Sequence, residues 1–250
     1  MLNGPMTHVT GNTTSTQLVQ YRELGLISYQ KAWDLQEDIF QNTIATKIQN
    51  RTAPPELQRQ TQHHLLLCEH PPVVTLGKNA NINNLLIPED GSNGVEVFHI
   101  NRGGDVTFHG PGQLVGYPIL DLDRIYTDIG RYLRDLEECI IRVLGDYEIQ
   151  GERLPGATGV WLEPENPFRA RKICAMGIRC SRWVTMHGFA FNINTDLDYF
   201  NLIVPCGISD KAVTSLEKEL GRQVDMQEIR DRFLHHFARI FNMEIQHNDG

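Results

Sequence analysis

The order of its β-patterned segments constrains the fold of this chain more than any other feature. Short runs rich in Val, Ile, Thr and aromatic residues, separated by turn residues, are typical of strands. They come in blocks with helical patterns between the blocks, whereas a strict βαβ protein would place a helix after each strand. The order therefore predicts an α+β fold. The predicted strands are 63–70, 73–77, 95–102, 105–109, 113–120, 159–162, 171–180 and 184–194.

Three segments carry apolar residues at helical spacing. The first begins at Ser28 and is ended by the run TAPP (52–55), because proline cannot continue a helix. The second begins near Thr127 and carries a single apolar stripe. The third begins with Asp225 and Glu228, which have the spacing of a capping box.

The chain shows no internal repeat, no low-complexity linker and no clear domain boundary. Its 250 residues are enough to bury a core without disulfides or metals. We therefore predict a single domain over residues 18–245. Residues 1–17 are polar and contain too few apolar side chains to repay ordering, so they predict a flexible N-terminal tail.

Composition excludes several classes of protein. The formal charge is −8 and the 23 Lys and Arg residues are scattered, so the sequence predicts no nucleic-acid partner. Five cysteines, an odd number, follow an N-terminal run without an apolar signal segment, which predicts reduced thiols in the cytoplasm. No apolar stretch approaches the roughly 20 residues that span a bilayer, so no membrane partner is expected.

A glycine-rich stretch, RGGDVTFHGPGQLVGYP (102–118), lies between predicted strands. It lacks the Gly-Lys-Ser/Thr ending of a P-loop, and it does not open a helix as a dinucleotide-binding fingerprint does. Its glycines would let the main chain approach a ligand closely, or they would simply form two tight hairpin turns. Residues alone leave both readings open.

Histidines give no metal signature. His109 and His187 each precede a glycine at the expected end of a strand, in FHG and MHG. A lone histidine more often satisfies hydrogen bonds than binds a metal, and the remaining His and Cys residues lack zinc-ligand spacing. We therefore predict no metal site.

Two residue types point to thiol chemistry. Cys206 lies between Pro205 and Gly207, a setting that suits a side chain presented to a cleft. Its thiol needs a base or a positive neighbour to act as a nucleophile. Lys172 lies in the apolar strand-like run RKICAMGIRC and could supply that base if it is partly buried. A surface lysine on an edge strand is the alternative. Strand alternation would place Lys172, Cys174 and Met176 on one face.

Taken in order, these segments resemble the lipoyl(octanoyl) transferase family over roughly residues 20 to 240. The motifs that carry the resemblance are EHPPVVTLG (69–77), RGGDVTFHGPGQLVGYPIL (102–120), GVWL (159–162), RKICAMGIR (171–179), HGFAFNINTDLDYF (187–200), IVPCGI (203–208) and VTSLEKEL (213–220). The resemblance implies a single-domain, mixed-sheet fold of the biotin/lipoate protein ligase type with flanking helices.

The resemblance also implies the reaction. Cys206 would accept an octanoyl or lipoyl group from acyl carrier protein as a thioester, and Lys172 would lower the pKa of that thiol and move protons. The acceptors would be apo lipoyl domains of 2-oxoacid dehydrogenase complexes and the glycine cleavage H protein, with no cofactor. The implied substrate contacts are Arg102, Gly103, Gly104, Asp105, Val106, Thr107, Phe108, His109, Ala175, Met176, Gly177, Gly188, Phe189 and Ala190.

Three other functions remain open at this point. An ATP-dependent lipoate protein ligase of the same fold would not need a thiol at Cys206. A cysteine thioesterase would have to admit water to the acyl-enzyme. A non-catalytic protein that binds lipoyl domains would have no need of Lys172 or Cys206, and both are present.

Overall fold

The main sheet forms the centre of the protein. The structure is a computed structural model and describes residues 16–92, 94–204 and 212–248. Within these residues, nine strands form a mixed sheet in the order β12-β1-β2-β6-β10-β9-β8-β7, with β11 paired to β9. These strands are β1 (Gln17–Leu26), β2 (His63–Glu69), β6 (Gln113–Ile119), β7 (Glu152–Leu154), β8 (Ala157–Leu162), β9 (Arg171–Ser181), β10 (Val184–Asn192), β11 (Ala212–Val213) and β12 (Met243–His247).

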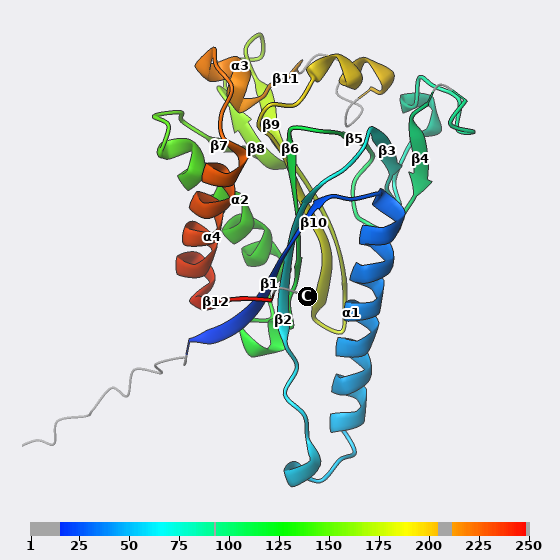
Figure 1. The fold of residues 1–250 in the computed structure, drawn as a ribbon, viewed down its shortest axis with the longest axis vertical. Helices are drawn as coiled ribbons and strands as arrows, with labels where there is room; N and C mark the ends of the chain where they lie inside the picture. The colour runs from blue at the N-terminus through cyan, green and yellow to red at the C-terminus, as the bar shows by residue number, and fades with distance from the viewer. Residues whose placement is uncertain (1–15, 93, 205–211, 249–250) are drawn as a thin grey trace, which may run out of the picture.

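Helices cover both faces of this sheet. Figure 1 shows α1 (Tyr29–Asn50) along one face and α2 (Ile129–Gly145) and α4 (Met226–Phe241) against the other. Strand alternation in β10 explains the two cores: Phe189 and Phe191 pack with α2 and α4, while Met186 and Ala190 pack with α1. A short helix, α3 (Leu216–Leu220), precedes α4. The predicted α+β class is confirmed.

A second, three-stranded sheet lies at the N-terminal end of α1. It has the order β4-β3-β5, formed by β3 (Val73–Leu76), β4 (Glu96–His99) and β5 (Val106–His109). Tyr29, the first residue of α1, packs against Val73 and Ile100. This contact fixes the small sheet over the end of the large one.

The helix predictions hold, with one difference at α4. Asp225 is the N-cap of α4, and its side chain accepts a hydrogen bond from the Gln227 N–H. Glu228 Oε1 instead accepts from the hydroxyl of Tyr147 and from Arg232. The N-cap half of the predicted capping box is therefore present. Among the described contacts, the second half, a hydrogen bond from the Asp225 backbone N–H to the Glu228 side chain, is not.

The strands at the two ends of the chain, β1 and β12, were not predicted. β1 pairs in parallel with both β2 and β12, so each pairing joins distant parts of the sequence. On β1, Val19 and Tyr21 are the buried residues, too few to give a clear alternation. Gln17 already belongs to β1, and the rest of the predicted tail, residues 1–15, lies outside the described residues.

Candidate active site

A cavity of about 450 Å³ lies where the small sheet meets the large one. Its size is in the range of small-molecule sites in proteins. Its walls come from the segment before β5, from β9 and β10, and from α1 through Tyr29. The predicted residues that line it are Arg102, Gly103, Gly104, Asp105, Val106, Thr107, His109, Lys172, Ala175, Met176, Gly177, Gly188, Phe189 and Ala190.

Phe108 is the predicted contact that does not line this cavity. Its ring is buried and stacks on Tyr199, with centroids 4.8 Å apart, and meets Phe200 edge-on. Phe108 packs instead in a buried apolar cluster that includes Phe200 and Ile203. Phe108 therefore supports the wall from behind.

Lys172 lies on β9 at the rim of the cavity. Its Nζ is 4.7 Å from the centroid of the Trp161 ring, a cation–π contact. Val213 of β11 pairs in register with Lys172, and the Thr214 N–H donates to the Lys172 carbonyl. The amine is thus held on a strand rather than on a mobile loop.

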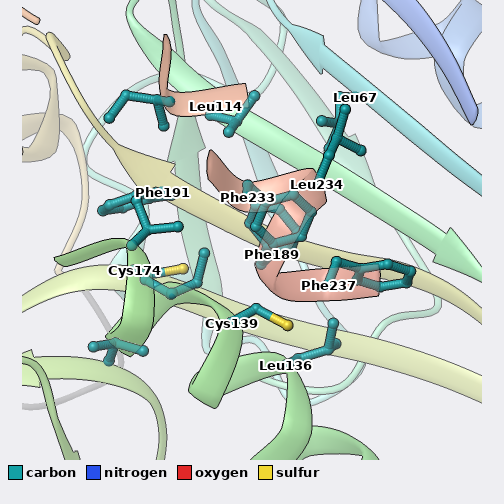
Figure 2. Packing of buried hydrophobic residues seen from close by; sticks show 14 of the residues in the cluster. Leu67, Leu114, Leu136, Cys139, Cys174, Phe189, Phe191, Phe233, Leu234 and Phe237 are labelled. Atoms are coloured by element: carbon teal, nitrogen blue, oxygen red, sulfur yellow. The ribbon is translucent and has the colours of Figure 1, made fainter. Parts of the chain in front are cut away.

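The prediction that Lys172 and Cys174 share a face is wrong, because a β-bulge at Ile173 changes the alternation. Opposite β8, Trp161 pairs with Lys172 and Val160 with Cys174, so Ile173 is the extra residue. Cys174 turns into the core against α2 and α4, where Figure 2 shows it among buried apolar side chains. Lys172 turns to the opposite face, on which Ala175 lines the cavity.

The four described cysteines are poor nucleophiles. Burial raises the thiol pKa of Cys68, Cys139, Cys174 and Cys180 above the ordinary value. A raised pKa leaves even less thiolate at neutral pH. Cys206, the predicted nucleophile, lies outside the described residues.

Arg102 is fixed inside the wall by the small sheet. Its Nη2 donates to the carbonyl and to Oγ1 of Thr75, at 2.9 and 3.0 Å, and its Nη1 donates to the Gly103 carbonyl. The side chain is 8% exposed. Because charge-assisted bonds hold it to β3, Arg102 brings a fixed positive charge to the cavity.

Two glycines allow the strands and the wall to approach closely. A Cβ on Gly177 would lie 2.6 Å from the carbonyl oxygen of Gly103. A Cβ on Gly188 would lie 2.2 Å from the carbonyl oxygen of Gly116. No side chain fits either gap, so these positions require glycine for packing.

The hydrogen bonds around His109 determine its tautomer. Gln113 Nε2 donates to the Phe108 carbonyl, so Gln113 Oε1 must accept from His109 Nδ1, 2.8 Å away. The contacts of Asn192 support this orientation of the Gln113 amide. Its Oδ1 accepts from Gln113 Nε2, and its Nδ2 donates to the Thr214 carbonyl. His109 Nε2 is therefore the acceptor. Burial, with His70 nearby, lowers the pKa of His109 to about 3, so the ring is neutral.

His187 was noted in the sequence but not assigned to the site. It lines the cavity, is 2% exposed and adopts a positive φ of 57°. Its backbone N–H donates to Oε1 of Gln36 on α1. Both ring nitrogens are buried and have no hydrogen-bond partner among the described residues.

Several cavity residues were missed because they are apolar or aromatic residues within strand and helix patterns. Tyr29 starts α1, Val115 and Tyr117 lie on β6, and Leu133 lies on α2. As single residues in apolar patterns they look like ordinary core positions. Tertiary packing alone brings them to one cavity.

Comparison with known proteins identifies the family. A family model described as the lipoyl protein ligase A/B catalytic domain matches residues 28–238. The chain belongs to this family. An octanoyltransferase from Cytophaga hutchinsonii is 52% identical over 237 residues, covering 94% of this chain and 96% of the relative. An octanoyltransferase from Flavobacterium psychrophilum is 53% identical over 230 residues, covering 91% and 98%.

Solved structures of lipoyl protein ligases share the fold. A bipartite lipoate protein ligase from Thermoplasma acidophilum superposes with a TM-score of 0.66 at 15% identity, over 93% of this chain and 86% of that one. Lipoate-protein ligase A bound with ATP gives 0.65 at 15% identity, over 93% and 88%. The predicted ligase-type fold is confirmed, and at this identity the likeness extends to the fold alone.

Proposed function

We propose that this chain transfers an octanoyl group from acyl carrier protein to a lysine of an apo lipoyl domain, through a thioester on Cys206. The observation that carries octanoyl transfer is the 52–53% identity, over more than nine-tenths of the chain, to relatives named octanoyltransferase. The reaction makes the protein an acyltransferase of lipoate biosynthesis. The acyl donor, the thioester and the roles of individual residues are our proposal.

Lys172 is the proposed base. Its place at the cavity rim, beside Trp161, puts the amine next to a surface that would exclude water from one side. The chain reaches Val213, which pairs with Lys172, seven residues after Cys206. The positive amine would favour the Cys206 thiolate, and the neutral amine would take its proton.

Two acyl transfers complete the proposed reaction. The Cys206 thiolate attacks the donor thioester carbonyl, and the carrier thiol leaves with a proton from Lys172. The acceptor lysine amine, after losing a proton to Lys172, then attacks the Cys206 thioester, which forms an amide and regenerates the thiol. The first transfer exchanges one thioester for another, and the second gives the more stable amide. Neither step requires ATP.

The cavity is the proposed site for the acyl chain. Val115, Ala175 and Ala190 give it an apolar surface between Lys172 at the rim and the buried wall. Gly103 and Gly104 of the stretch 102–118 line the cavity, and their main chain is the proposed side wall of the acyl pocket. Contact between this wall and the acyl chain is part of the proposal.

Intact-mass measurement tests the reaction. Incubation with octanoyl acyl carrier protein, without ATP, should add one octanoyl group, which disappears when apo lipoyl domain is added. Cys206→Ala should not be acylated, and Cys174→Ala is the matched control that should be. An acylated Cys206→Ala protein would contradict the assignment, and a requirement for ATP would favour the ligase reading.

The remaining identities are proposals of the same kind. Apo lipoyl domains of 2-oxoacid dehydrogenase complexes and the glycine cleavage H protein are the proposed acceptors, and the cytoplasm is the proposed compartment. No helix in the described part of the chain is long and apolar enough to cross a membrane. Parallel transfer assays with the two acceptor types would rank them.

A further inference from the structure

The cavity has an exposed rim and a buried floor. The lining residues Asn79, Gly104 and Gly156 are exposed and mark the rim, and Lys172 is half-buried. Val115, Tyr117, Ala190 and His187 on the other side are buried. An acyl chain that enters at the rim would extend toward this floor.

His187 lies far from Lys172 along the sheet. It pairs with Ile178 of β9, which lies six residues after Lys172. One of these six residues, Ile173, is the extra residue of the bulge, so five contribute to the length of the strand. At about 3.3 Å per strand residue, the two positions are roughly 16 Å apart. Each carbon added to the chain would bring its tail closer to His187.

The floor at His187 carries polar ring atoms that are buried. Both ring nitrogens are buried without a partner among the described residues, and His187 is 2% exposed. Buried polar atoms in proteins nearly always have a partner, which can be an ordered water or a ligand. Burial, with Arg102 and Arg179 nearby, lowers the pKa of His187 to about 3, so the ring is a neutral donor and acceptor.

Two features fix the backbone at His187. His187 has a positive φ, which is uncommon for a residue other than glycine, within strand β10. Its backbone N–H donates a hydrogen bond to Oε1 of the fully buried Gln36 on α1. Helix α1 packs along β10 (Figure 1). The His187 backbone is therefore fixed at the wall of the cavity, with its ring among the lining side chains.

We propose that His187 limits the length of the acyl group, because a chain that reaches it displaces its water and leaves both ring nitrogens covered by methylene groups. This specificity role rests on the proposed acyl transfer. A shorter chain ends in the apolar part of the cavity and leaves the ring hydrated. The penalty for burying an unpaired polar group predicts roughly a tenfold discrimination against the longer chain.

Competition between acyl lengths tests the proposal. Acyl carrier proteins loaded with C6, C8, C10 and C12 chains are mixed, and the acyl-enzyme is read by intact mass. The unmodified protein should favour C8 over C12 by about tenfold or more. His187→Leu removes the polar ring and should raise the C12 to C8 ratio about tenfold.

His187→Asn is the matched control, because asparagine tolerates positive φ and keeps a polar floor while freeing volume. It should keep the preference for C8. A larger shift to C12 in His187→Asn than in His187→Leu would mean that volume, not polarity, sets the limit, and would overturn the proposal. Equal acylation of the unmodified protein by C8 and C12 would overturn it without any variant, even if His187→Leu does not fold. Absence of acylation at every length would instead reject the proposed function.

Discussion

Adding one methyl group at Gly177 should displace the wall of the cavity. The new Cβ would lie 2.6 Å from the Gly103 carbonyl oxygen, about 0.8 Å short of ordinary contact. Gly103 is itself fixed, because its N–H donates to the Ile178 carbonyl at 2.9 Å. The wall segment at Gly103 must therefore move away from β9 by a large part of that distance.

The structure gives the size of the effect. Overpacking of this kind costs about 1–3 kcal/mol of stability. At about 2–4 °C per kcal/mol for a chain of this size, Gly177→Ala should lower Tm by roughly 2–12 °C. A wall displaced by nearly 1 Å should also slow acyl transfer by about 100-fold, measured well below Tm.

Gly145→Ala is the matched control for this prediction. A Cβ on Gly145, the last residue of α2, meets nothing within 4 Å. Gly145→Ala should leave the transfer rate unchanged and stabilise α2 slightly. Thermal unfolding and single-turnover acylation measure both proteins. If Gly177→Ala matches Gly145→Ala in Tm and rate, the close approach of the wall to β9 is wrong.

Three further predictions follow from the site and the core. Lys172→Met should slow acyl-enzyme formation by about 10²–10⁴-fold with little change in Tm. The control Lys218→Met, on α3, should leave the rate unchanged. Equal rates in the two variants would exclude Lys172 as the base. Glu137→Ala should cost about 2 kcal/mol in urea unfolding, because the buried Gly159 N–H loses its acceptor; an unchanged midpoint would contradict this. The free energy of unfolding should also fall as pH drops from about 6.5 toward 4, because the buried histidines stay neutral in the folded protein and become protonated in the unfolded chain. Each such histidine should lower the free energy of unfolding by up to about 1.4 kcal/mol per pH unit. A flat urea midpoint over that range would contradict it. These histidines are His63 and His70, with pKa lowered by burial to about 4, and His109 and His187, lowered to about 3.

Elements with a strong local pattern could be predicted from the sequence. The apolar stripe of α2 and the stop after α1 depend on neighbouring residues, and both helices formed where expected. The strands β1 and β12 could not be predicted, because their partners lie far away in the chain. Their sequences become strands through pairing, with little apolar pattern of their own.

The candidate site was predictable as a set of motifs and not as a geometry. The motifs around Arg102, Lys172 and Gly188 are recognisable in order along the chain, and all three residues line one cavity. Alternation failed at Lys172, because a bulge cannot be seen in a sequence that reads as a regular strand. The Cys206 assignment still rests on its Pro-Cys-Gly setting and on the family resemblance.

By itself, the sequence determined the α+β class, the approximate positions of the long helices, the family and the motifs that contribute most of the cavity wall. These properties depend on local residue patterns and on the order of motifs along the chain. The tertiary structure alone decided which face Lys172 occupies, which nitrogen of His109 accepts and why His187 is left with two buried polar atoms. Each of those depends on the contact of residues from different strands and helices, and such contacts exist only after the chain has folded.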